Sequence, residues 1–166
     1  FFFSTISYTQ NADIKDPILK NVLVNNLCVD NDLNGNAESD ADFNNDGEIQ
    51  VSEALLVKRL KLDFHKIESI EGLEYFLNLE QLLINLNKLT ELNFKSDLPK
   101  LKKIQAIDNS IVHMDLSLLT GLTNLEIGGN DLGKLTEDML PLSLEIIDFD
   151  YNILLDTILI KNHPTL

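Results

Sequence analysis

Apolar side chains recur along this chain in one repeated phrase. Its clearest copy is Leu79-x-x-Leu82-x-Ile84-x-x-Asn87-x-Leu89, with apolar residues at positions 1, 4, 6 and 11 and an asparagine at position 9. The five copies begin at residues 57, 79, 101, 122 and 144, so the steps between them are 22, 22, 21 and 22 residues. A constant period of this length is typical of a solenoid, in which each repeat packs on the next.

The spacing within the phrase predicts a strand. Positions 4 and 6 lie two residues apart, so both side chains point into the core, whereas positions 3, 5 and 7 point outward. Position 9 can bond backbone groups as the chain leaves the strand, and stacking places these side chains in a ladder. The ladder consists of His65, Asn87, Asn109, Asn130 and Asn152.

This phrase is the leucine-rich-repeat motif. We therefore predict an α/β solenoid, a leucine-rich-repeat horseshoe with parallel strands on its concave face and a helical N-terminal cap. The segments between phrases are short, so the convex side is expected to be extended or 3₁₀-helical. Residues 55–166 hold five repeats, and Leu166 falls at position 1 of a sixth, where the repeats are expected to be truncated.

Two segments precede the repeats. Residues 1–11 are apolar and then polar, which predicts the remnant of a signal peptide; an ordinary apolar strand or tail is the alternative. Residues 12–54 form the predicted cap, because the open end of a solenoid has to be covered. Asp16-Pro17 begins its amphipathic helix, over 16–27. The apolar face of that helix contains Ile18, Leu19, Val22, Leu23 and Leu27.

The net charge of the chain limits the classes of partner that it can bind. Lys and Arg total 13 against 27 Asp and Glu, a net charge of −14. Such a chain repels phosphate backbones and anionic membrane surfaces, so we expect neither nucleic-acid binding nor membrane insertion. Cys28 has no cysteine partner in this chain and is expected to be a small apolar residue of the helix.

The clearest candidate site in the sequence is residues 42–53. This stretch matches the EF-hand loop pattern D-x-[DN]-x-[DN]-G-x5-E at every specified position. Ca²⁺ takes six to eight hard oxygen ligands, and a glycine at loop position 6 permits the required turn. The predicted ligands are Asp42, Asn44, Asp46, the backbone carbonyl of Glu48, Gln50 and Glu53. The alternative is a solvated acidic turn that matches by accident.

The stretch just before it repeats the front half of this loop. Its candidate ligands for a second, weaker ion are Asp30, Asp32, Asn34 and Asp40. The twelfth position is Ala41, so the bidentate closing carboxylate is missing from its expected place.

The block from Asp46 to Ala54, followed by 22-residue repeats, resembles the secreted bacterial leucine-rich-repeat surface proteins of internalin-like type, over residues 12–166. The resemblance implies a calcium-stabilised cap on an exported, secreted or cell-surface solenoid. It also implies that the solenoid binds a protein or glycan at a surface.

Outward residues of the strands and of position 8 form the candidate binding face, because aromatic and charged groups on a rigid concavity suit recognition. They are Arg59, Lys61, Phe64, Leu83, Leu86, Lys103, Gln105, Glu126, Asp148, Asp150 and Tyr151. The face is expected to run from basic at the first repeat to acidic at the last. The alternative is that five varied strands always show such a mixture.

Catalysis finds little support in the sequence. No Ser/His/Asp spacing suggests a triad, and no glycine-rich loop could hold a phosphate. We predict that the chain is a binding module and not an enzyme. Two alternatives stay open: a dockerin-like module that docks through its calcium loop, and a passive spacer that displays a C-terminal domain.

Overall fold

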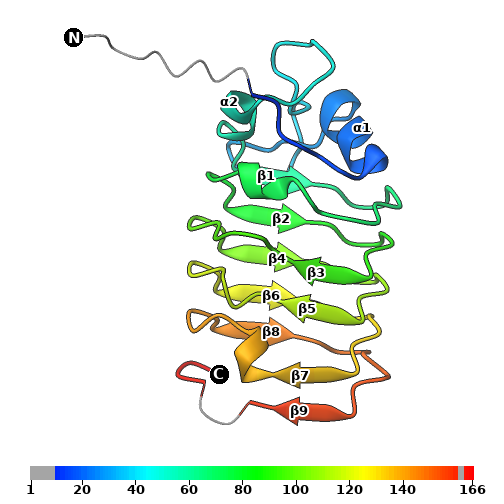
Figure 1. Cartoon of the computed structure of the whole chain (residues 1–166), viewed down its shortest axis with the longest axis vertical. Coiled ribbons are helices and arrows are strands. Elements are labelled where there is room, and N and C mark those ends of the chain that lie inside the picture. Colours follow the sequence, from blue (N-terminus) through cyan, green and yellow to red (C-terminus); the bar gives the residue numbers. More distant parts are fainter. Residues whose placement is uncertain (1–9, 161–162) are drawn as a thin grey trace, which may run out of the picture.

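The fold is a straight stack of coils, seen in a computed structural model that describes residues 10–160 and 163–166 (Figure 1). Successive repeats place their strands side by side below an N-terminal cap. The predicted signal remnant lies outside the described residues except for Gln10 and Asn11. These two residues pair with the end of the 42–53 stretch. Asn11 bridges Gln50, and Gln10 accepts a hydrogen bond from the N–H of Val51 at 2.9 Å.

Every copy of the repeated phrase forms one short strand of a single parallel sheet. The strands are β1 (Arg59–Lys61), β2 (Gln81–Leu83), β4 (Lys103–Gln105), β6 (Asn124–Glu126) and β8 (Ile146–Asp148). Position 4 pairs with position 4 throughout, as Leu60 with Leu82. This residue is fully buried in the first four strands, and its neighbours face outward. The predicted parallel sheet is confirmed.

The convex side contains the extended and 3₁₀ segments that the short return predicts. The extended segments are β3 (Glu91–Asn93), β5 (His113–Asp115), β7 (Lys134–Thr136) and β9 (Thr157–Leu159). They pair in parallel, β3 with β5 and β7 with β9. The 3₁₀ turns are η1 (Leu73–Tyr75) and η2 (Glu137–Met139).

The asparagine ladder holds neighbouring repeats together. Asn109 donates from Nδ2 to the carbonyls of Ile84 (3.0 Å) and Ala106 (3.2 Å), and its Oδ1 accepts from the N–H of Leu89 (3.1 Å). Asn87, Asn130 and Asn152 make the same kind of contacts and, like Asn109, are at most 9% exposed. Each amide therefore satisfies backbone groups of its own repeat and of the one before it.

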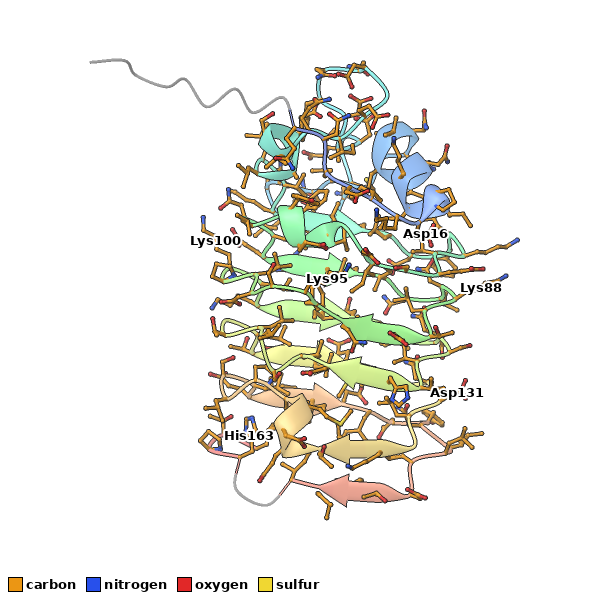
Figure 2. All side chains as sticks on the ribbon, in the orientation of Figure 1. Asp16, Lys88, Lys95, Lys100, Asp131 and His163 are labelled. Atoms are coloured by element: carbon orange, nitrogen blue, oxygen red, sulfur yellow. The ribbon has the colours of Figure 1, made fainter. Side chains whose placement is uncertain are left out.

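The cap is built on helix α1 (Pro17–Asn25), for which Asp16 is the N-cap as predicted. The Asp16 side chain lies between the helix and the first repeat (Figure 2). The helix is shorter than the predicted 16–27, because Asn26 is already extended (φ −118°, ψ 147°). Leu27 was therefore wrongly assigned to the buried face: it is 68% exposed.

Beyond the helix, residues 28–30 close the edge of the sheet. Val29 bridges Leu60 in antiparallel orientation, and the N–H of Lys61 donates to the carbonyl of Cys28 at 2.8 Å. Cys28 is thus buried in an extended segment, and its assignment to the helix was wrong. The unpaired groups of β1, which would otherwise invite another strand, are covered in this way. A second short helix, α2 (Val51–Ala54), begins within the 42–53 stretch and ends one residue beyond it.

Candidate functional site

The 42–53 loop is fixed at its start by Asp42, which is 3% exposed. Its carboxylate accepts hydrogen bonds from the N–H groups of Asp46 (3.1 Å) and Gly47 (2.8 Å). Gly47 has φ of 86°, a left-handed conformation that glycine adopts without steric cost. Ile49 is 1% exposed and anchors the loop in the core. The turn predicted for a cation loop is therefore present.

Glu53 closes the same loop from the first turn of α2. Its Oε1 accepts from the N–H of Asn44 at 3.0 Å, and its Oε2 accepts from the N–H of Gln50 at 2.9 Å. The carboxylate of Glu48 instead pairs with Lys20 at 2.7 Å. Glu48 is predicted to bind calcium through its backbone carbonyl, so the ion pair of its side chain does not affect that role.

Asp46, Asn44 and Gln50 occupy the exposed side of the loop. Gln50 donates from Nε2 to both carboxylate oxygens of Asp46, at 3.1 and 3.0 Å. This bond, the N–H of Glu48 and the amide of Asn44 lower the pKa of Asp46 against a smaller effect of burial. The carboxylate is held ionised, as a calcium ligand has to be.

The residue types of this loop fit calcium, but their oxygens are engaged with loop N–H groups. Within residues 10–160 and 163–166, no three His, Cys, Asp or Glu side chains form a group that could hold a metal ion. The side chains of Asp42, Asp46 and Glu53 therefore have to converge further to complete a shell.

The preceding loop has the same backbone as the 42–53 loop. Leu33 and Gly35 have φ of 61° and 99°, where Asn45 and Gly47 have 60° and 86°. Asp30 accepts from the N–H of Gly35 at 2.9 Å, as Asp42 does from Gly47. The sequence therefore contains two copies of one turn.

Two contacts of this second loop were missed by sequence reasoning. Arg59 pairs with Asp30 at 2.5 Å, and Glu38 accepts from the Asn34 amide at 3.1 Å. Burial raises the pKa of Asp30, but the Arg59 hydrogen bond, the Gly35 N–H, the Arg59 charge and Asp32 together lower it. The charge of Asp40, the predicted fourth ligand, contributes to the raised pKa of the Cys28 thiol.

The predicted basic residues of the concave face are engaged in internal contacts, two of which are ion pairs. Arg59 also donates to the Gln81 side chain, and Lys61 donates to the Gly35 carbonyl. Lys103 pairs with Glu126 at 2.6 Å, and Gln105 donates to the same carboxylate. Position-5 residues lie side by side in the order Lys61, Leu83, Gln105, Glu126, Asp148.

At the other end of the face, no described cation forms an ion pair with Asp148 or Asp150, and both are exposed. Asp148 and Asp150 therefore have no ion-pair partner among the described residues, whereas Arg59 and Lys103 are ion-paired.

Position 8 lies beside this sheet and is apolar or aromatic in three of the five repeats; Asp108 and Gly129 occupy it in the two repeats between Leu86 and Tyr151. Phe64, Leu86 and Tyr151 are 73%, 43% and 84% exposed. All three have left-handed backbones, with φ of 68°, 55° and 59°. Such a conformation costs an L-residue about 1 kcal/mol, a cost that glycine avoids. Sequence analysis placed these side chains on the binding face but did not predict their left-handed backbone conformation.

A hollow on the convex side was also missed. It has a volume of about 390 Å³ and is lined by Glu68, Glu71, Glu74, Glu91 and Lys95, among others. Lys95, labelled in Figure 2, pairs with Glu71 at 2.5 Å. These residues come from the return segments of two repeats, so their meeting depends on the stack and not on a local motif.

No helix among the described residues has the length and apolarity needed to cross a bilayer. Comparison with curated proteins gave no match. A solved structure with a similar fold is the functional domain of InlJ from Listeria monocytogenes, which includes a cysteine ladder. It is 18% identical, with a TM-score of 0.46, and the alignment covers 86% of this chain and 33% of that one.

One family profile matches more than half of the chain. It is described as the endo-β-N-acetylglucosaminidase EndoS leucine-rich-repeat (LRR) domain and matches residues 46–152, which include α2 and the five strands of the concave sheet. The chain belongs to this family of leucine-rich-repeat domains.

Proposed function

We propose that this chain is the binding module of a secreted or cell-surface bacterial protein and holds a protein or glycan ligand on its concave face. The observation that carries the proposal is the exposure of Phe64, Leu86 and Tyr151 in left-handed backbone. Large apolar side chains at positions where glycine is less strained point to a use outside the fold. Extended concave surfaces are where repeat proteins bind their ligands.

The family name directs the choice of ligand. An endo-β-N-acetylglucosaminidase acts within glycans that contain N-acetylglucosamine, so we propose a glycan-bearing protein as the ligand. Exposed Tyr and Phe suit such a surface, because aromatic residues are enriched in binding sites.

Surface plasmon resonance tests this function with one N-glycosylated protein immobilised beside its deglycosylated form. We expect Phe64→Ala and Tyr151→Ala each to weaken binding about tenfold or more. Alanine leaves the strained backbone in place, so the side chain alone is tested. Leu142→Ala is the matched control, because Leu142 is 74% exposed and lies between η2 and β8.

The outcomes separate the parts of the proposal. If both variants bind like Leu142→Ala, the position-8 side chains are not the binding surface. If binding survives deglycosylation but is lost in the variants, the ligand is the protein surface and not its glycan.

We further propose a structural calcium ion in the 42–53 loop. Asp42 and Glu53, the two buried carboxylates, hold opposite ends of this loop, and its remaining donors are oxygen atoms suited to Ca²⁺. An ion that binds only the folded cap adds its binding free energy to stability. The ion acts on the fold and takes part in no reaction.

A second candidate function is that of a passive spacer beside another domain, favoured by the family's name, which is that of an enzyme. A spacer makes no contact with ligand, so the Phe64→Ala and Tyr151→Ala variants would leave all binding unchanged. The plasmon resonance experiment therefore distinguishes the two candidates directly.

A further inference from the structure

Asp30 is a fully buried carboxylate with one unpartnered oxygen. Its Oδ2 accepts from Arg59 and from the N–H of Gly35, whereas its Oδ1 has no hydrogen-bond partner among the described residues. Buried polar atoms in folded proteins almost always have a partner, and an ionised oxygen is the costliest to leave alone. This oxygen can therefore accept a bond from a water molecule, a proton or a cation.

The groups around Asp30 favour a cation. Asp32 lies close enough to Asp30 to affect the pKa of that carboxylate. A hydrogen bond between two carboxylates requires a proton, and Arg59 opposes protonation of Asp30. A metal ion brings two acidic oxygens together without a proton.

Two further side chains complete the cluster. Asn34 donates from Nδ2 to Asp32 at 2.8 Å and to Glu38 at 3.1 Å, so it joins two exposed carboxylates. No described cation forms an ion pair with either of them, and Lys61 donates to the nearby Gly35 carbonyl instead. Negative charge therefore remains beside the buried oxygen.

We propose that the 30–38 loop binds a divalent, oxygen-preferring cation, with Asp30 Oδ1 as its buried ligand and with Asp32, Asn34 and Glu38 as exposed ligands. As in the 42–53 loop, the carboxylates have to converge further to complete a shell. This site is separate from the calcium ion proposed for the 42–53 loop. The backbone turn shared by the two loops places the position-1 carboxylate in the same relation to its glycine in each. The absence of a closing Glu makes this the weaker site.

Arg59 links the proposed cation site to the concave face. Its guanidinium bridges Asp30 and Gln81, so it joins the loop to the first two strands. A cation on Oδ1 leaves Oδ2 to Arg59 and therefore holds the guanidinium in place at the start of the face.

Isothermal titration with CaCl₂ on the full chain tests the site by counting bound ions. We expect two ions on the wild type and one on the double variant Asp32→Asn, Glu38→Gln. Both substituted residues are exposed, so the cap stays folded, which circular dichroism checks. Asp13→Asn is the control, because it removes one charge from an exposed residue outside both loops.

Glu53→Gln distinguishes the two proposals. An ion that persists in Glu53→Gln and is lost when Asp32→Asn and Glu38→Gln are added supports the 30–38 site, whether or not the other loop binds. The proposal is overturned if Glu53→Gln binds no calcium. It is equally overturned if the double variant binds as many ions as Asp13→Asn with the same affinity.

Discussion

The Oδ2 atom of Asp16 accepts a hydrogen bond at 2.7 Å from the backbone N–H of Glu68, which lies 52 residues further along the chain. The other oxygen of the same carboxylate caps α1, through the N–H groups of Ile18 (2.7 Å) and Leu19 (3.0 Å). One buried side chain thus caps the helix and fastens it to the first repeat. The cap and the solenoid are expected to unfold together.

Replacement of Asp16 by alanine should therefore cost more than the loss of an ordinary helix cap. The cap contributes about 1 kcal/mol, and the N–H groups of Glu68 and Ser69 also lose their partner. We expect a loss of about 3 kcal/mol in the free energy of unfolding, measured by urea denaturation. Asp13→Ala is the control, since that exposed carboxylate pairs only with Lys15, and an equal loss there would refute the account.

Stability should fall in acid through the same carboxylate. Burial raises the pKa of Asp16, but four N–H groups, those of Leu19, Glu68, Ser69 and Ile18, together lower it below its ordinary value of 3.8. A lowered folded-state pKa adds stability above the unfolded-state value, and this stability is lost as pH falls through the folded-state pKa. Urea midpoints between pH 6 and pH 2 should decline less steeply in Asp16→Asn than in the wild type. Parallel curves would show that Asp16 does not contribute.

The asparagine ladder predicts a second stability effect. Asn109→Ala leaves the buried N–H of Leu89 without its acceptor and removes a link between two repeats. We expect a loss of about 2 kcal/mol, seen as a melting temperature lower by roughly 4–8 °C. Asn93→Ala is the matched control, because Asn93 is exposed on the convex side. Equal melting temperatures for the two variants would exclude a structural role for the ladder.

The Cys28 thiol should be unreactive in the folded protein. Burial, with a contribution from the charge of Asp40, raises the pKa of its thiol to about 12. The reactive thiolate is therefore almost absent at pH 8, and the sulfur is fully enclosed. We expect Ellman's reagent to label the thiol in urea but not in buffer. Rapid labelling of the native chain would contradict the buried position of residues 28–30.

The repeats were predictable because their signal is local and recurs. Leu82 and Ile84 show which way a strand faces, and Asn87 marks where it ends, so five copies determine the sheet and its register. Asp16-Pro17 likewise predicted the start of α1, because capping depends on adjacent residues.

Contacts between the cap and the sheet were not predictable in this way. Arg59 is an outward residue of β1 by its spacing, and nothing near it in the sequence shows that Asp30 lies opposite. Leu27 fits the helical period, but the chain leaves the helix early to pair with β1, and tertiary pairing prevails over local propensity. Glu38 was missed for another reason: its local contact with Asn34 depends on the turn and does not belong to the EF-hand pattern.

Thermal melts with and without 10 mM calcium test the cap most directly, on Glu53→Gln beside Glu48→Gln. Both variants remove one carboxylate from the same loop, but Glu48 contributes only its backbone carbonyl to the proposed shell, because its side chain pairs with Lys20. For a dissociation constant of about 0.1–1 mM, calcium should add about 1–3 kcal/mol and raise the melting temperature of Glu48→Gln by roughly 3–10 °C. We predict that the rise in Glu53→Gln is less than half as large. Equal rises in the two variants, or no rise in either, would contradict a calcium ion in the 42–53 loop.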